Sequence, residues 1–148
     1  MKVPNNILIP EWKKLLEEGK EVRFMPSGSS MRPFIEGDQD NVILAPLSRD
    51  PRVGDILLAT VVNHDKSTTY VLHRLVRIRK NEKGIVYILQ GDGNLSGEEY
   101  CRREDIIGRV RRIESPTGRK KCLTRGRLWY FLKPFRGFLL KVYRHLIR

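Results

Sequence analysis

The sequence predicts a mainly β fold, a small barrel or a coiled β-sheet, with a short helix before it and an amphipathic helix after it. Between residues 21 and 114, short apolar runs rich in β-branched side chains alternate with Gly, Pro, Asn and Asp, which is typical of closely spaced strands. After residue 127, apolar residues recur at steps of three and four, which indicates a helix. With 148 residues, 40% of them hydrophobic and 31% charged, the chain suits one domain with a modest core.

The N-terminal segment, residues 1–20, is predicted to contain a helix over residues 10–18. Pro10 suits the start of a helix, and Gly19 suits the position just after its end. The apolar face of this helix is formed by Trp12, Leu15 and Leu16.

The β-rich segment spans residues 21–114. Its predicted strands cover residues 22–25, 41–45, 55–62, 70–79, 84–89 and 105–113. Between them lie turn-forming stretches at residues 26–30, 50–54, 80–83 and 91–94.

The C-terminal segment, residues 115–148, begins with a polar, basic linker over residues 115–127 and continues with a predicted helix over residues 134–147. Pro134 starts this helix or kinks it. The helical stripe consists of Leu128, Phe131, Leu132, Phe135, Phe138, Leu139, Val142 and Leu146.

Positive charge is concentrated in the same segment. The chain has 29 Lys and Arg against 17 Asp and Glu, a net charge of +12. No acidic residue follows Glu114, and residues 115–148 carry ten of the basic residues. Such a tail indicates an anionic partner, either nucleic acid or a lipid surface. The candidate membrane-binding cations are Lys133, Arg136, Lys141 and Arg144.

Two alternatives apply to residues 128–148. The apolar stripe can pack on the β body, because a small barrel needs a covering element, and its charges are then merely solvated. Nucleic-acid binding fits the basic composition, but the absence of a helix-turn-helix or a recognised RNA-binding motif disfavours it.

Several classes of protein are disfavoured by what the sequence lacks. Two cysteines, Cys101 and Cys122, are too few and too far apart for a disulfide scaffold or a zinc site, and we expect neither a metal nor another cofactor. Residues 1–6 lack the pattern of a secretory signal, and no apolar run approaches the roughly 18 residues of a membrane span. We therefore expect a cytoplasmic protein, with peripheral attachment to a membrane as the further option.

Residues 28–33, Gly-Ser-Ser-Met-Arg-Pro, are the most informative segment. A serine hydroxyl becomes a nucleophile when it is exposed beside a base, and a turn built on Gly and Ser can present it. Successive N–H groups of Gly28, Ser29 and Ser30 can face a developing oxyanion. The alternative is an ordinary flexible turn of small residues.

The order of the remaining motifs favours the catalytic interpretation. Ser-Met-Arg-Pro is followed by Gly-Asp pairs at residues 37–38, 54–55 and 91–92, by Leu-His-Arg at residues 72–74, and by Gly-Arg-Val at residues 108–110. As a set, these motifs resemble the signal peptidase superfamily of serine peptidases, which includes the self-cleaving SOS-type repressors. The resemblance covers residues 23–112 and implies a β peptidase fold that needs no cofactor.

The resemblance implies that His73 is the general base. Type I signal peptidases and SOS repressors have a lysine at the corresponding place, whereas this chain has Leu72-His73-Arg74, similar to the archaeal and endoplasmic-reticulum branch. Histidine suits the role, since its ordinary pKa is about 6.5. The alternative is a partly buried strand histidine. The other histidines, His64 and His145, are interpreted as solvated.

Asp92 is the predicted third member, which would orient the imidazole and stabilise its charged form. A simple turn aspartate is an almost equal alternative, since Gly-Asp-Gly-Asn suits a turn. In the family the acid can also lie a few residues later. Those positions offer Glu98, Glu99 and, further on, Asp105.

The sequence thus predicts a serine endopeptidase that cleaves an extended peptide or protein through an acyl-enzyme, with small residues before the cut if it follows the family. It departs from the family at Phe34, where a small residue is usual, and at Gly28, which offers no side-chain oxyanion donor. No membrane span precedes Ser30, which weakens the case for a preprotein-processing role. The alternative function is a catalytically inactive protein that binds nucleic acid or a membrane through its basic tail.

Overall fold

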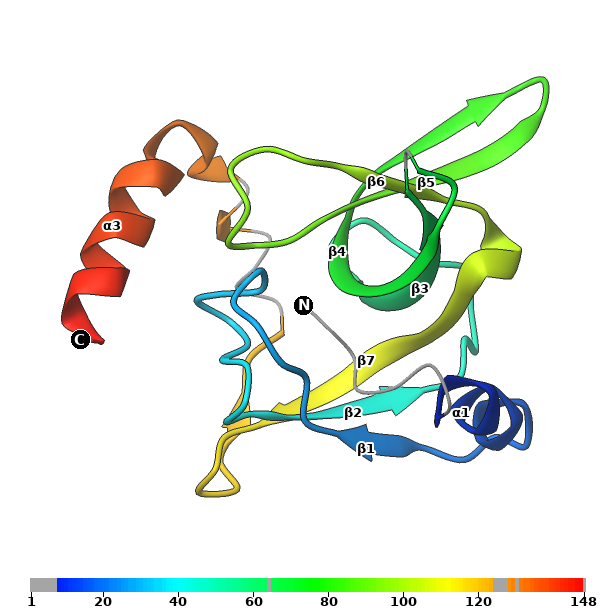
Figure 1. Ribbon diagram of the computed structural model, residues 1–148, viewed down its shortest axis with the longest axis horizontal. Helices are drawn as coiled ribbons and strands as arrows, with labels where there is room; N and C mark the ends of the chain where they lie inside the picture. Colours follow the sequence, from blue (N-terminus) through cyan, green and yellow to red (C-terminus); the bar gives the residue numbers. More distant parts are fainter. Residues whose placement is uncertain (1–7, 64, 124–127, 130, 148) are drawn as a thin grey trace.

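The computed structural model describes residues 8–63, 65–123, 128–129 and 131–147. Figure 1 shows a strongly curled sheet with the N-terminal helix packed against it and the C-terminal helix on the opposite side of the molecule, next to loops. The mainly β prediction is confirmed. In chain order the elements are α1 (Leu8–Glu17), β1 (Val22–Phe24), β2 (Asn41–Ala45), β3 (Ile56–Val62), β4 (Thr68–Asn81), β5 (Gly84–Gln90), β6 (Glu99–Cys101), the 3₁₀ turn η1 (Arg103–Asp105), β7 (Ile106–Glu114), β8 (Lys120–Lys121), the 3₁₀ turn η2 (Lys133–Phe135) and α3 (Arg136–Leu146).

The strands form one antiparallel sheet in the order β1-β2-β7-β3-β4-β5-β6, and β8 pairs with β7. The strand order ends at β1 and β6, so the sheet is open. Of the two predicted forms, the fold is therefore the coiled sheet and not the closed barrel. The register shifts once in each of the pairings β2–β7, β3–β7 and β4–β5. Bulges of this kind bend strands and increase their twist, which accounts for the tight curl of β3 and β4 in Figure 1.

The core occupies both faces of the sheet. Along β3, Ile56 and Leu58 belong to one buried cluster, and Leu57 and Ala59 belong to the other. This division follows from the period of two along a strand. A strand with a continuous apolar sequence is therefore buried on both sides, and the residues of β4 next to it also alternate between two buried environments.

The helix α1 covers the first cluster. Ile9, Trp12 and Leu16 are its buried residues, and the Trp12 ring lies 4.7 Å from that of Phe24 on β1. The predicted apolar face is thus confirmed. Leu15 is only partly buried at its edge.

Two short strands were not expected from the sequence. β6 has three residues and β8 has two, too few to show an alternating pattern, and β8 lies within the predicted linker. β4 also extends two residues beyond the prediction at each end.

The predicted C-terminal helix is present as η2 and α3, with Pro134 in the 3₁₀ turn before the α-helix. No helix in the described part of the chain is long and apolar enough to cross a membrane. The prediction for His64 falls outside the described residues.

Candidate active site

Ser30 lies in the loop between β1 and β2, and this loop is held by close backbone contacts. The amide of Asp38 donates to the Pro26 carbonyl at 2.8 Å. A Cβ on Gly37 would lie 2.0 Å from the carbonyl oxygen of Gly28, so only glycine fits there. Met31 anchors the loop from within the core, where it is fully buried. The serine is therefore presented by a fixed turn, not by a flexible one.

His73 comes from the middle of β4, where it pairs with Leu57 of β3. It lies on the same face of the strand as Leu75, and it is 3% exposed. Its Nε2 atom lies 2.9 Å from the Oγ atom of Ser30. His73 is a buried strand histidine, as the alternative interpretation held, and it also contacts the predicted nucleophile.

Glu99, the first residue of β6, completes the row. Leu75 pairs with Leu89 of β5, and Leu89 pairs with Glu99. Directly paired residues share a face of the sheet, so Glu99 lies on the His73 face. Its Oε2 atom is 2.9 Å from His73 Nδ1, and its side chain is 26% exposed.

The prediction that Asp92 orients His73 is wrong. Both carboxylate oxygens of Asp92 accept hydrogen bonds from Arg74, at 2.8 and 2.7 Å, and the pair is almost completely buried. Arg74 follows His73 on β4, so the two side chains leave opposite faces of the strand, and Asp92 lies on the Arg74 face. Burial raises the pKa of the Asp92 carboxyl, and the hydrogen bonds and charge of Arg74 oppose that shift.

The other acidic candidates have partners elsewhere. Glu98 accepts from Arg77 at 2.9 Å, and Asp105 accepts from the amide of Arg102 at 2.7 Å. Of the acids kept open by the sequence, Glu99 is the one placed against the imidazole.

The loop of residues 91–94 contacts the backbone of the Ser30 loop directly. The amide of Gly93 donates to the Ser30 carbonyl at 2.7 Å. A Cβ on Gly91 would lie 2.4 Å from that same carbonyl oxygen, and one on Gly93 would lie 2.8 Å from the carbonyl oxygen of Ser29. Both glycines are thus required by close approach, and Arg74 holds their loop through Asp92.

The C-terminal segment fastens this loop from outside. The indole N–H of Trp129 donates to the Asp92 carbonyl at 2.9 Å. Arg136 donates to the same carbonyl at 2.8 Å and to the Asn94 carbonyl at 3.1 Å. The prediction of Arg136 as a membrane-facing cation is therefore wrong, because it is 2% exposed and holds backbone carbonyls.

The departure at Phe34 also has a structural explanation. The Arg74 guanidinium lies over its ring, 5.4 Å from the centroid, and the Trp129 ring meets it edge-on at 6.0 Å. Such contacts between aromatic rings and cations are favourable. A large side chain at this position thus joins the buried ion pair to the C-terminal segment.

The polar contacts of His73 select the tautomer of its imidazole. A carboxylate only accepts hydrogen bonds, so Nδ1 carries the proton that faces Glu99. In neutral imidazole this leaves the lone pair on Nε2, directed at the Ser30 hydroxyl. The arrangement can accept the hydroxyl proton and stabilise the resulting imidazolium. The oxyanion role of Gly28, Ser29 and Ser30 stays a prediction, with Gly28 at a φ of 95°.

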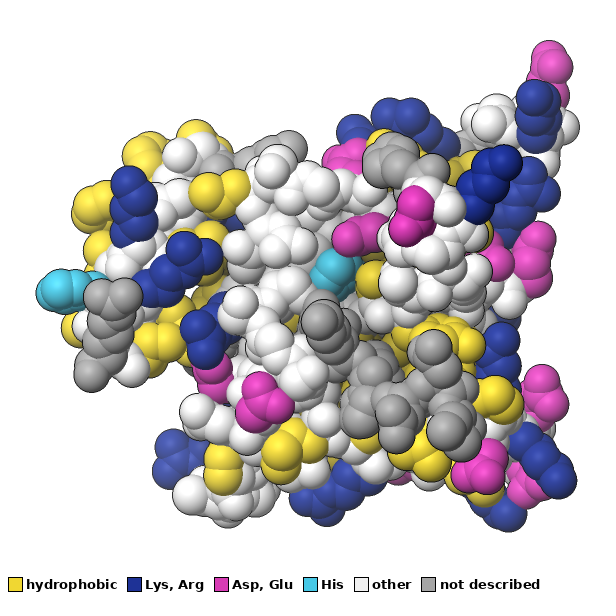
Figure 2. Space-filling model, viewed as in Figure 1, with side chains coloured by type: hydrophobic (Ala, Val, Ile, Leu, Met, Phe, Trp, Pro, Cys, Tyr) yellow, Lys and Arg dark blue, Asp and Glu magenta, His cyan; other side chains and the backbone are white. Residues whose placement is uncertain are grey.

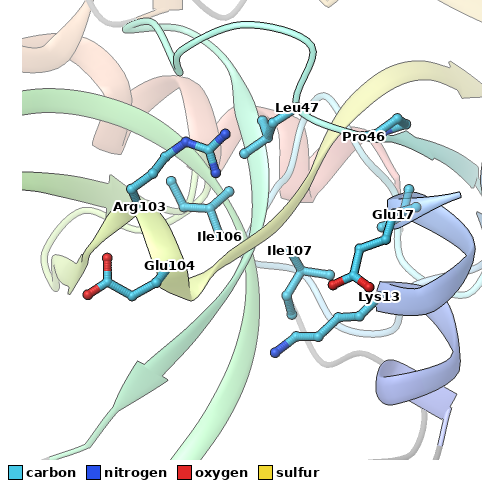
Figure 3. A pocket seen from close by; sticks show the side chains of 9 residues that line it. Lys13, Glu17, Pro46, Leu47, Arg103, Glu104, Ile106 and Ile107 are labelled. Carbon is cyan, nitrogen blue, oxygen red and sulfur yellow. The ribbon is translucent and has the colours of Figure 1, made fainter. Parts of the chain in front are cut away.

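The surface around the candidate site and helix α1 has two pockets. Figure 3 shows one of about 320 Å³ between α1 and the start of β7, with Lys13 and Glu104 among its lining residues. Another, of about 470 Å³, is lined by Pro33, Phe34 and residues 120–122, beside the serine loop. Among the described residues, no group of three or more His, Cys, Asp or Glu is placed to hold a metal ion.

The sequence matches no model of a known protein family and no curated protein sequence.

Proposed function

We propose that this protein is a serine peptidase in which Ser30 is the nucleophile, His73 is the general base and Glu99 orients the base. The observation that carries the proposal is the unbroken row of contacts, Ser30 Oγ to His73 Nε2 at 2.9 Å and His73 Nδ1 to Glu99 Oε2 at 2.9 Å. Nucleophile, base and orienting group within hydrogen-bond reach are the signature of an activated serine.

The proposed reaction uses the contacts of both imidazole nitrogens. His73 takes the hydroxyl proton as Ser30 Oγ attacks the peptide carbonyl carbon, and Glu99 stabilises the imidazolium. His73 then gives the proton to the leaving amine, and the peptide C–N bond breaks to leave an acyl-enzyme. Water, deprotonated by His73, attacks the ester carbonyl; the ester C–O bond then breaks and His73 returns the proton to Ser30 Oγ, which restores the free enzyme. No cofactor takes part in these steps.

The oxyanion of each tetrahedral intermediate is proposed to be bound by N–H groups of the turn formed by Gly28, Ser29 and Ser30. Support comes from the rigidity of that turn, which Gly37 and the residue 91–94 loop hold by close backbone approach. Preorganised donors are effective because they need no reorganisation during the reaction. The substrate class that we propose is an extended peptide with small residues before the cut, as the family resemblance implies.

A peptide-cleavage assay with two serine variants tests the proposal. Ser30→Ala should reduce cleavage in a mixture of peptides with small residues to the uncatalysed background. Ser48→Ala is the matched control, since it removes an exposed hydroxyl from the turn after β2, outside the candidate site, and it should retain cleavage. The proposal fails if both variants cleave like the wild type, or if His73→Gln leaves the rate unchanged while unfolding curves show that it is folded.

A further inference from the structure

The helix α3 has one face that packs on the loops of the candidate site. Arg136 and Leu140 are buried, and the Tyr143 hydroxyl donates to Glu36 at 3.1 Å. These residues are spaced by four and three, so they lie on one side of the helix. Their contacts determine how α3 lies against the protein.

A second side of the same helix is apolar and exposed. Phe135, Phe138, Val142 and Leu146 follow at steps of three, four and four, and Phe138 and Leu146 are 69% and 79% exposed. Figure 2 shows hydrophobic side chains gathered with Lys and Arg over the C-terminal helix of Figure 1. The alternative that this stripe packs on the β body is therefore wrong for these residues. A contiguous exposed apolar patch marks an interaction site.

The surroundings of the stripe select the partner. No acidic residue is present among residues 115–148, which carry ten Lys and Arg, and Lys141 and Arg144 are exposed on α3. These two cations, with Leu95, Gly137, Phe138 and Leu140, line a cavity of about 380 Å³ between α3 and the loop after β5. An apolar hollow with cations among its lining residues suits an anionic lipid, with its phosphate near the cations and its chain in the hollow.

Other occupants fit these observations less well. A second copy of the chain would bring two cationic tails together, which is repulsive. Nucleic acid would satisfy the charges, and unpaired bases can stack on phenylalanine, but stacking would leave the aliphatic side chains of Val142 and Leu146 uncovered.

We propose that α3 docks on the surface of an anionic lipid bilayer, with Phe135, Phe138, Val142 and Leu146 inserted and with Lys141 and Arg144 at the phosphates. Basic amphipathic helices bind bilayers in this manner. The proposal extends to regulation, and this part rests on the proposed function. Trp129 and Arg136 hold the residue 91–94 loop, which bonds to the Ser30 carbonyl, so lipid bound to α3 also restrains the loop that supports the nucleophile.

Co-sedimentation with vesicles tests the docking without reference to activity. The wild-type protein should bind phosphatidylglycerol–phosphatidylcholine vesicles, and the double variant Phe138→Ser/Leu146→Ser should bind at least about tenfold more weakly, because it has less apolar area to bury in the bilayer. The variant should fold normally, since both side chains are exposed. Val62→Ser, which removes an exposed apolar side chain from the end of β3, is the matched control and should bind like the wild type.

The cations have a separate prediction. Lys141→Gln/Arg144→Gln should weaken binding to the anionic vesicles by about 30-fold, from roughly 1 kcal/mol for each cation near the surface, and should leave the weak binding to pure phosphatidylcholine unchanged. Docking on lipid is overturned if binding is the same in all variants, or if Phe138→Ser/Leu146→Ser abolishes self-association in a protein that does not bind vesicles.

The regulatory part is measured by peptide cleavage with and without anionic vesicles. Vesicles should raise the rate of the wild type and not that of Phe138→Ser/Leu146→Ser, whose rate in solution stays normal. Cleavage that is insensitive to bound vesicles overturns the regulation alone. Vesicle binding by a protein that cleaves no peptide overturns the proposed function and the regulation that rests on it, and supports the docking.

Discussion

Glu99→Gln should slow peptide hydrolysis and leave the fold intact. Glu99 accepts from His73 Nδ1 at 2.9 Å, and catalysis places positive charge on that imidazole. A hydrogen bond between charged groups contributes about 1.5–3 kcal/mol, so its loss should lower kcat/KM by about 10- to 150-fold. The Glu99 side chain is 26% exposed, and water can solvate the substituted amide, so the free energy of unfolding should change by less than about 1 kcal/mol.

Asp92→Asn should mainly destabilise the fold and should affect catalysis less than Glu99→Gln does. The Asp92 carboxylate is bound at both oxygens by Arg74, and both side chains are almost completely buried. Removal of one partner from a buried ion pair costs about 3–5 kcal/mol, because the other charge is left uncompensated. The free energy of unfolding should fall by that amount, and kcat/KM per folded molecule should fall less than in Glu99→Gln.

Urea unfolding followed by circular dichroism, together with kcat/KM on a fluorogenic peptide, separates the two effects. Glu98→Gln is the matched control, because Glu98 precedes Glu99 and pairs with the exposed Arg77. It should change neither quantity appreciably. The reasoning is refuted if Glu98→Gln and Glu99→Gln lose activity equally. It is also refuted if Asp92→Asn unfolds at the wild-type urea concentration and loses more activity than Glu99→Gln.

Three further substitutions probe features around the site. Burial raises the pKa of the Asp55 carboxyl, but hydrogen bonds from the Arg49 guanidinium and the Arg52 amide lower it by more. The pKa of Asp55 therefore lies below its ordinary value. The ionised carboxylate stabilises the fold fully above about pH 4, and this contribution is lost as the pH falls through the lowered pKa. Asp55→Asn should therefore cost about 1–2 kcal/mol of unfolding free energy at neutral pH and nothing in strong acid. Burial raises the pKa of the Cys101 thiol to about 12, whereas Cys122 is exposed. A disulfide reagent at mildly alkaline pH should therefore modify the native protein at Cys122 alone, and Cys122→Ser should abolish the reaction. Gly91→Ala places a Cβ 2.4 Å from the Ser30 carbonyl oxygen, and the displaced nucleophile should cost about 10²-fold in kcat/KM.

A different result would contradict each of these three predictions. An unfolding free energy for Asp55→Asn that runs parallel to the wild type into strong acid would remove the titration argument. Equal modification rates at Cys101 and Cys122 would remove the burial argument. Gly137→Ala is the control for the loop glycine, since its Cβ meets a neighbour at an ordinary 3.7 Å. It should retain activity and gain up to about 1 kcal/mol of stability, so an equal loss in both glycine variants would contradict the steric reasoning.

Much of the fold was predictable because each long strand carries its own signal. β2, β3 and β7 are apolar and rich in β-branched residues, and their predicted bounds agree with the structure to within one residue at each end. The three residues of β6 are too few to show such a pattern. This strand forms through its pairing with β5, a tertiary contact that the local sequence does not reveal. The coiled form was also open until the bulges and sheet edges were placed.

The part of the site that was predicted correctly also carries its signal in the local sequence. Ser30 and His73 stand in recognisable local motifs, whereas the choice between Asp92 and Glu99 depends on strand register. One local signal was available: adjacent residues of a strand face opposite sides, so an acid that pairs with Arg74 does not share a face with His73. A helical period likewise groups Arg136 with Leu140 and Tyr143, on the face that packs.

The most direct test of the central claim, that His73 activates Ser30, is acylation by a serine-directed fluorophosphonate, with the adduct mapped by mass spectrometry. One adduct, on Ser30, is predicted for the wild type and for Ser48→Ala. Ser30→Ala should carry none, and folded His73→Gln should react far more slowly. Adducts spread over several serines, or an unchanged rate at Ser30 in His73→Gln, would contradict the account.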